Sequence, residues 1–155
     1  MVSTFIGNNE VKLDDKGRFF IPAQYRKILS SMDNEGGKRV VLNRDLSSNC
    51  LVIYPEQVWN QSIEQLYKRI NPWKTSDMLL FQQYTAGAEY LEIDAQGRIL
   101  IPKRIFQQVG ITSNELLIVG AYDRFAIWDK QTFESKLESN DVFAERIQER
   151  MTDTF

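Results

Sequence analysis

The chain has 155 residues, 43% of them hydrophobic and 26% charged, which is enough for about one globular domain with a buried apolar core. Its formal net charge of −2 excludes a uniformly basic nucleic-acid-binding surface, so any such surface must be local. With no histidine and a single cysteine, the sequence offers no basis for a structural zinc site, an intrachain disulfide or a histidine general base, and we expect no metal, no cofactor and no enzymatic activity.

A repeat relates the two halves of the chain. When the sequence is shifted by 80 positions, 6 of the 16 residues from 7 to 22 find an identical partner. The identical pairs are Gly7 and Gly87, Asp14 and Asp94, Gly17 and Gly97, Arg18 and Arg98, Ile21 and Ile101, and Pro22 and Pro102. We therefore predict two copies of one module, residues 1–75 and residues 76–155, which interlock into one globular unit because neither has enough apolar surface to fold alone.

Each copy is predicted to begin with a β-hairpin and a helix. In the first copy, residues 11–13 alternate apolar and polar side chains, which is typical of a half-buried strand. Residues 14–17 begin with aspartate and end with glycine, which favours a type I turn closed by a left-handed glycine. Residues 18–21 form the return strand, and Pro22 suits the first position of a helix. The second copy repeats these elements 80 positions later, and Gly110 ends its helix.

Each copy then continues with a second hairpin and a second helix. Pro55 begins that helix in the first copy, and Asp129 caps it in the second. Residues 71–73 interrupt the chain between the copies, residues 78–84 form a short connecting helix, and a helical tail follows Asp141. The predicted strands of the second hairpins are residues 38–43 and 50–54, and residues 115–120 and 124–128.

The repeated boxes resemble the MraZ family. They are LDDKGRFFIP at residues 13–22 and IDAQGRILIP at residues 93–102, and residues 5–7 (FIG) add to the first. The resemblance covers nearly the whole chain. It implies an α+β fold, an AbrB-like swapped-hairpin β-barrel that both copies build together, with flanking helices.

The same resemblance implies a function. It points to a sequence-specific, DNA-binding transcriptional regulator of bacteria, cytoplasmic and nucleoid-associated, that assembles into a closed homo-oligomeric ring. Its partner would be double-stranded DNA, as short direct repeats in the promoter of the cell-division and cell-wall gene cluster that contains its own gene. The implied DNA contact is the Asp-x-x-x-Arg motif of the hairpin, here Asp14 with Arg18 and Asp94 with Arg98.

The first motif is the stronger candidate for binding DNA. A guanidinium such as that of Arg18 can donate to O6 and N7 of guanine or to a phosphate, and Asp14 can orient it. Lys16, at the tip of the turn, is a candidate for a phosphate contact. The alternative is that Asp14 only closes the turn while Arg18 pairs with it on the surface, and that Lys16 is a solvated turn residue.

The second motif is the weaker candidate because of its surroundings in the sequence. Residues 1–75 carry 11 Lys and Arg against 8 Asp and Glu, whereas residues 76–155 carry 8 against 13. Arg98 could therefore pair with Asp94 for structure alone. Arg26 and Lys27, on the first helix, could touch the DNA backbone, but an exposed helix face is the commoner explanation for them.

Two readings compete with DNA binding. A ring-forming scaffold without DNA is the more serious one, since apolar helices and the tail suit contacts between subunits. An enzyme related to self-cleaving barrels lacks support, because the chain has no Gly-Ser pair. We expect no membrane partner, because there is no signal-peptide pattern at the N-terminus and no run of about 18 apolar residues. We also expect no small-molecule substrate. Cys50 is expected to be a small buried residue, and Trp59, Trp73 and Trp128 to pack in a core or an interface.

Overall fold

Strands and helices follow the predicted order through both copies. The computed structural model describes residues 4–32, 37–45 and 47–152. Its strands are β1 (Asn8–Lys12), β2 (Arg18–Phe20), β3 (Arg39–Asp45), β4 (Cys50–Pro55), β5 (Glu89–Glu92), β6 (Arg98–Leu100), β7 (Glu115–Gly120) and β8 (Phe125–Asp129). Its helices are α1 (Ala23–Met32), α2 (Glu56–Lys68), α3 (Thr75–Ala86), α4 (Lys103–Gln108), α5 (Lys130–Lys136) and α6 (Asn140–Thr152). The connecting helix and the helical tail are thus confirmed as α3 and α6.

The helix ends follow local sequence signals, with one correction. Pro55 and Pro102 are the N-cap residues of α2 and α4, and Pro22 directly precedes α1, so each helix begins one residue later than predicted. The backbone of Pro55 and Pro102 is extended, with ψ angles of 141° and 143°, so neither proline has the helical conformation and each helix starts at the next residue. Asp129 caps α5 as predicted and accepts a hydrogen bond from the backbone N–H of Thr132 at 3.0 Å.

The predicted second hairpins are confirmed. Strand β3 pairs antiparallel with β4, and β7 pairs antiparallel with β8. They form the centre of a six-stranded sheet in the order β1-β7-β8-β4-β3-β5. The two hairpins meet through β4 and β8, so the first and second copies share one sheet.

The predicted first hairpins differ from expectation in their pairing. Strands β1 and β2 do not form a ladder with each other, although the backbone N–H of Asp14 donates to the carbonyl of Arg18 at 2.9 Å and closes the turn between them. Instead, β1 pairs with β7, β5 pairs with β3, and β2 pairs with β6 in a separate two-stranded ribbon. Each of these pairs joins the first copy to the second. Three-residue strands such as β2 and β6 form few hydrogen bonds of their own, so burial in a shared core decides their partners.

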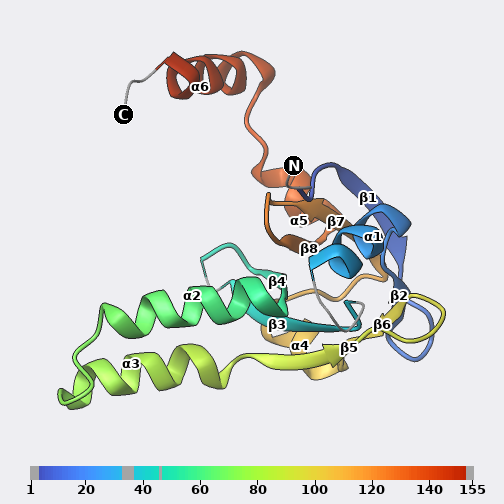
Figure 1. Ribbon diagram of the computed structural model, residues 1–155. Coiled ribbons are helices and arrows are strands. Elements are labelled where there is room, and N and C mark those ends of the chain that lie inside the picture. The colour runs from blue at the N-terminus through green and yellow to red at the C-terminus, as the bar shows by residue number, and fades with distance from the viewer. Residues whose placement is uncertain (1–3, 33–36, 46, 153–155) are drawn as a thin grey trace.

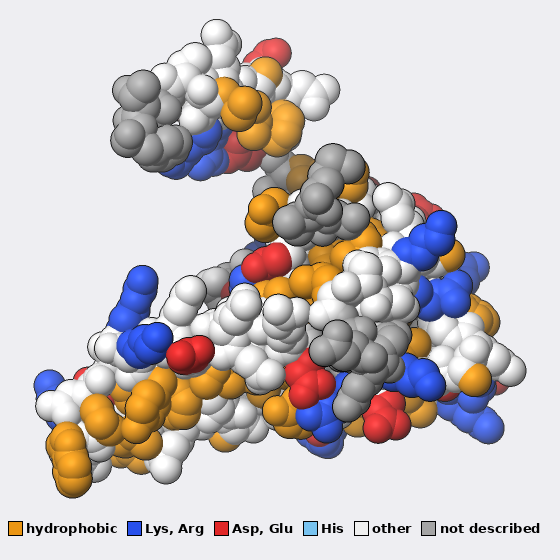
Figure 2. Space-filling view, in the orientation of Figure 1, with side chains coloured by type: hydrophobic (Ala, Val, Ile, Leu, Met, Phe, Trp, Pro, Cys, Tyr) orange, Lys and Arg blue, Asp and Glu red, His pale blue; other side chains and the backbone are white. Residues whose placement is uncertain are grey.

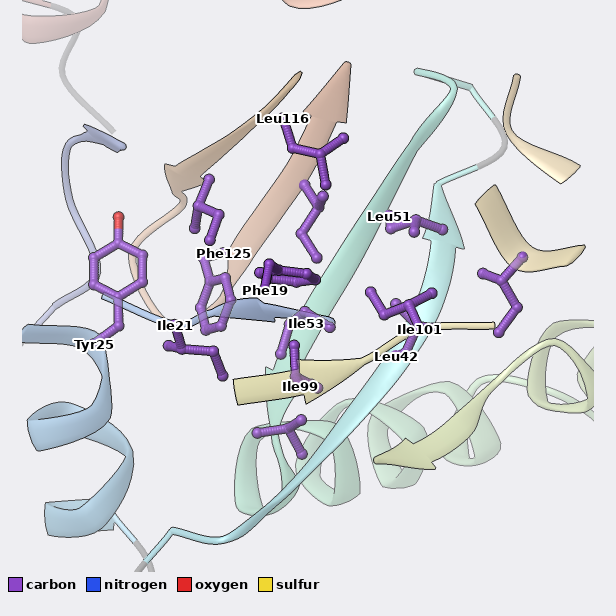
Figure 3. Close-up of a cluster of buried hydrophobic side chains, with 14 of the residues drawn as sticks. Phe19, Ile21, Tyr25, Leu42, Leu51, Ile53, Ile99, Ile101, Leu116 and Phe125 are labelled. Atoms are coloured by element: carbon purple, nitrogen blue, oxygen red, sulfur yellow. The ribbon is translucent and has the colours of Figure 1, made fainter. Parts of the chain in front are cut away.

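The main core is built by both copies. Phe19 from β2 and Ile99 from β6 are 2% and 1% exposed and lie among buried side chains of the large sheet, as Figure 3 shows. At one end of this core, the rings of Phe5, Tyr25 and Phe125 lie 5.1 to 5.2 Å apart between centroids. Residues of both copies contribute to this core, which explains why the strands pair across the repeat.

Two parts of the chain project from this body (Figure 1). Helices α2 and α3 form a helical hairpin. At the end of this hairpin that joins the sheet, the Trp59 ring packs against those of Tyr54 and Tyr84. The C-terminal helix α6 lies apart from the body, and its described residues are all exposed. Among the described residues, no helix has both the length and the apolar character that would let it cross a membrane.

The three tryptophans have different environments. Trp59 is 3% exposed and belongs to a second small core with Val41 and Tyr54, so core packing is confirmed for it. Trp128 is half-buried and packs against Phe133 at 5.3 Å between ring centroids. Trp73 is 94% exposed at the tip of the helical hairpin, so packing in a core is wrong for this residue.

Candidate nucleic-acid interface

The first turn, residues 14–17, is organised by one carboxylate. The Oδ1 atom of Asp14 accepts hydrogen bonds from the backbone N–H groups of Lys16 and Arg18, both at 2.9 Å. Gly17 has a φ angle of 84°, in the left-handed region that favours glycine, and its N–H donates to the carbonyl of Asp14 at 3.1 Å. The turn geometry predicted from the sequence is confirmed, and it leaves the side chain of Lys16 exposed at the tip.

The second turn, residues 94–97, repeats this geometry. The Oδ1 atom of Asp94 accepts from the backbone N–H groups of Gln96 at 3.0 Å and Arg98 at 2.8 Å. Gly97 has a φ angle of 86°. Because two segments 80 residues apart adopt the same turn with the same side-chain hydrogen bonds, the local motif determines its own structure.

Each turn holds one arginine in a fixed orientation. The Nε atom of Arg18 donates to Oδ2 of Asp14 at 2.7 Å, and the Nε atom of Arg98 donates to Oδ2 of Asp94 at 2.9 Å. The side chains of Arg18 and Arg98 are 28% and 22% exposed. Their Nη1 and Nη2 atoms have no hydrogen-bond partner among the described residues. The carboxylate therefore orients the guanidinium through Nε and leaves its two terminal nitrogens available to a ligand.

The carboxylates of both turns are stabilised as anions. The backbone hydrogen bond from Arg18 is the largest cause that lowers the pKa of Asp14, and the Arg18 side chain and the N–H of Lys16 add to it, so that the pKa falls to about 2. The corresponding hydrogen bond from Arg98 lowers the pKa of Asp94 in the same way. Both aspartates are therefore ionised at neutral pH, which favours the arginine geometry just described.

Each turn lies against the start of the other copy's helix. The backbone N–H of Ile101 donates to the carbonyl of Gly17 at 3.2 Å. Lys103, the first residue of α4, lines a pocket of about 600 Å³ together with Lys16 and Phe106. Lys103 was not among the predicted site residues, and its only signal in the sequence is its position directly after the repeated Pro102. A lysine from the acidic second half of the sequence thus lies beside the first turn. The net charge of each half of the sequence therefore does not describe the charge around each turn.

The remaining predicted residues lie on α1. Lys27 is exposed, as an ordinary surface residue of a helix would be. Arg26 is half-buried and donates from Nε to the carbonyl of Ile21 at 3.1 Å, so it is more constrained than an exposed helix face implies. Figure 2 shows Lys and Arg side chains gathered on the side of the molecule where β2 and β6 lie in Figure 1.

Other chemistry in the described residues is sparse. Cys50 is 2% exposed, and burial raises the pKa of its thiol to about 12, so the expectation of a small buried residue is confirmed. The described part of the chain contains no group of three or more His, Cys, Asp or Glu side chains placed to hold a metal ion.

Comparison with known proteins decides the family. A family model described as "MraZ protein, putative antitoxin-like" matches residues 4–81 and 84–155, once in each copy. The chain belongs to the MraZ family. Proteins called Transcriptional regulator MraZ are similar over most of their length. The one from Bacteroides fragilis (strain ATCC 25285) is 38% identical over 147 residues, which cover 95% of this chain and 90% of that protein.

Two further MraZ relatives show the same coverage. The protein from Bacteroides thetaiotaomicron is 38% identical over 149 residues, covering 96% of this chain and 93% of its own. The protein from Serratia proteamaculans is 31% identical over 154 residues, covering 96% and 97%. Both also carry the name Transcriptional regulator MraZ. The MraZ similarity therefore extends over both turns, both hairpins and the helices between them.

Proposed function

We propose that this chain is a sequence-specific DNA-binding transcriptional regulator. The observation that carries the proposal is the pair of equivalent turns, each presenting one arginine whose Nε is held by an aspartate and whose terminal nitrogens are free of partners in the described structure. The names of the MraZ relatives support a role in transcription. The target would be short direct repeats in the promoter of the cell-division and cell-wall gene cluster that contains its own gene, at the bacterial nucleoid.

The first turn is the main DNA-binding element in this proposal. Arg18 would donate from its terminal nitrogens to O6 and N7 of a guanine in the major groove, while Asp14 keeps the guanidinium in place. Lys16, exposed beside it, would contact a phosphate and add affinity without sequence preference. Arg98 with Asp94 would make the weaker, second contact, supported by Arg26 and Lys27 from the first copy.

Assembly is the second part of the proposal. The strand pairs between copies support a swapped-hairpin β-barrel of the AbrB kind within one chain. A closed homo-oligomeric ring of such units would present several first turns along one duplex, which compensates for the net charge of −2 on each chain. Each additional turn that engages a repeated DNA box would multiply the affinity of the assembly.

A ring-forming scaffold without DNA is the alternative function. It is favoured by exposed apolar side chains on the projecting helices, where Leu79 and Leu80 are 59% and 60% exposed and Phe143 is 57% exposed. Figure 2 shows such side chains along the projecting hairpin of α2 and α3. Apolar surfaces of this kind are typical of contacts between subunits, and they are compatible with either function.

An electrophoretic mobility shift assay separates the two. The full-length protein is titrated against the duplex upstream of its own gene and against a scrambled duplex of the same composition. We expect a shift of the upstream duplex at lower protein concentration, and loss of that preference in the double variant Arg18→Ala and Arg98→Ala. Assembled wild-type protein that shifts neither duplex would contradict DNA binding and favour the scaffold.

A further inference from the structure

The side chain of Arg26 crosses from the first copy to the turn of the second. A Cβ atom at position 97 would lie 2.7 Å from Nη1 of Arg26 and 2.8 Å from its Cδ and Cζ. The guanidinium thus lies directly on the backbone of Gly97, in space that is open because residue 97 has no side chain. The backbone N–H of Ile21 donates to the carbonyl of Gly97 at 3.0 Å, which holds the second turn beside the start of α1.

This guanidinium is fixed but not neutralised. Its Nε donates to the carbonyl of Ile21 at 3.1 Å, which sets the plane of the group. In the described part of the chain, Arg26 forms no ion pair, and neither Nη1 nor Nη2 has a hydrogen-bond partner. A guanidinium held by a neutral carbonyl keeps its full charge and both terminal donors, the pair of groups with which arginine binds a phosphate in two hydrogen bonds.

The repeat shows what is particular to the second turn. The residue of the second copy that corresponds to Arg26 is Phe106, which is 4% exposed and lies beside the first turn. The first turn carries Lys16 at its tip, and the second carries Gln96 at the matching position. The first turn therefore has Lys16 at its own tip, with Lys103 of the other copy's helix beside it. The second turn has no lysine at its tip, and Arg26 of the other copy's helix lies on it.

We propose that Arg26 is the phosphate contact of the second turn. It would hold a backbone phosphate of the DNA next to Arg98, as proposed for Lys16 next to Arg18. This inference rests on the proposed DNA binding and adds to it the residue that lets the second hairpin engage DNA although its own tip is uncharged. Since a phosphate contact carries no sequence information, Arg26 contributes equally to all DNA sequences.

The test measures how binding depends on salt. Dissociation constants of the full-length assembled protein are measured by fluorescence anisotropy over a series of salt concentrations, for the duplex upstream of its own gene and for a scrambled duplex. Arg26→Met removes the charge but keeps an unbranched side chain to lie on Gly97, and Arg26→Gln is a second neutral variant. We expect both to reduce the slope of log Kd against log salt by about 0.9 per engaged second turn, on both duplexes.

Three comparisons complete the test. Arg26→Lys should recover most of the slope, because it restores the charge. Lys68→Met, on the end of α2 where Lys68 is 71% exposed, neutralises a cation far from both turns and should leave the slope unchanged. Adding Lys16→Met to Arg26→Met should lower the slope by a second, equal amount, as expected for two independent phosphate contacts.

The outcomes distinguish this inference from the function on which it rests. If wild-type protein binds the upstream duplex and the neutral Arg26 variants keep its slope, the inference is wrong and the proposed function stands. The same holds if the variants lose affinity only together with a fall in melting temperature, at an unchanged slope, since that indicates a packing role. If wild-type protein binds neither duplex, the proposed function itself fails.

Discussion

The backbone N–H of Ile21 donates a hydrogen bond to the carbonyl oxygen of Gly97 at 3.0 Å, across 76 positions of the sequence. The repeat provides the same bond in reverse, from Ile101 to Gly17 at 3.2 Å. Each hydrogen bond fixes the aspartate-glycine turn of one copy to the segment that leads into the first helix of the other. The position of either turn therefore depends on the whole chain, although its internal geometry depends only on its own few residues.

Neither copy is expected to fold alone. Expressed separately, residues 1–75 would lack strands β7, β6 and β5, with which β1, β2 and β3 pair in the whole chain. Residues 76–155 would lack strands β3, β2 and β1, with which β5, β6 and β7 pair. We expect both fragments to show no cooperative thermal transition by circular dichroism, whereas their co-expression should restore one. A single fragment that melts cooperatively as a monomer would show that the copies are independent domains.

Arg18 should contribute more to specific DNA binding than Arg98. Arg18→Ala should abolish measurable preference for the upstream duplex, since a base-edge arginine contributes about 1–3 kcal/mol of discrimination at each box. Arg98→Ala should lose less of this preference, because the second turn carries Gln96 where the first carries Lys16. Both arginines are partly exposed, so the melting temperature should change little in either variant. A larger loss of affinity for Arg98→Ala than for Arg18→Ala, at equal assembly, would reverse the assignment of the main turn.

The protein should be a homo-oligomer in solution. Leu80 and Phe143 are 60% and 57% exposed, and burying such side chains in another copy gains roughly 25 cal/mol per Å² of apolar surface. Multi-angle light scattering at micromolar concentration should give a mass that is a multiple of the single chain. Leu80→Ser and Phe143→Ser, combined, should reduce that mass while the thermal transition of the body persists. A monomeric mass for the wild-type protein would count against a ring.

The first turn should lose stability at low pH. The pKa of Asp14 lies at about 2 in the folded chain, below its ordinary value of 3.8. The ionised carboxylate therefore stabilises the fold above about pH 4, and this contribution is lost as the pH falls to about 2. Asp14→Asn removes the titrating group but keeps an oxygen acceptor. Between these two pH values, the melting temperature of Asp14→Asn should fall less than that of the wild type.

A neighbouring residue provides the control for this pH dependence. Asp15 is exposed on the same turn and makes no hydrogen bond with the described residues. Asp15→Asn should therefore follow the wild-type melting curve between about pH 4 and about pH 2. If Asp14→Asn and Asp15→Asn behaved alike, the hydrogen bonds of the turn would not be the source of the acid sensitivity.

Cys50 should be unreactive in the folded protein. Its side chain is 2% exposed and its thiol pKa is raised to about 12, so little thiolate forms near neutral pH. A thiol-specific disulfide reagent at about pH 8 should modify less than one tenth of the native protein in the time that completes the reaction in denaturant. Rapid modification of the native protein would show that β4 opens locally at its first residue.

The sequence by itself determined the local structures of both copies. Asp14 and Gly17 define a turn because a carboxylate can accept two nearby backbone N–H groups and glycine tolerates a φ angle of 84°. Asp129 caps α5 by a comparable short-range hydrogen bond. Such features depend on contacts within about five residues, so the spacing of residue types is enough to predict them, and the repeat doubled the number of observations.

Only the tertiary structure decided which strands pair and which charges meet. The expected ladder between β1 and β2 gives way to pairs between copies, because Phe19 and Ile99 are buried only in a core to which both copies contribute. The position of Arg26 on Gly97 follows from that interlocking and has no signal in the local sequence. Periodicity specifies which face of a strand is apolar, whereas the partner of that face depends on how the whole chain closes around one core.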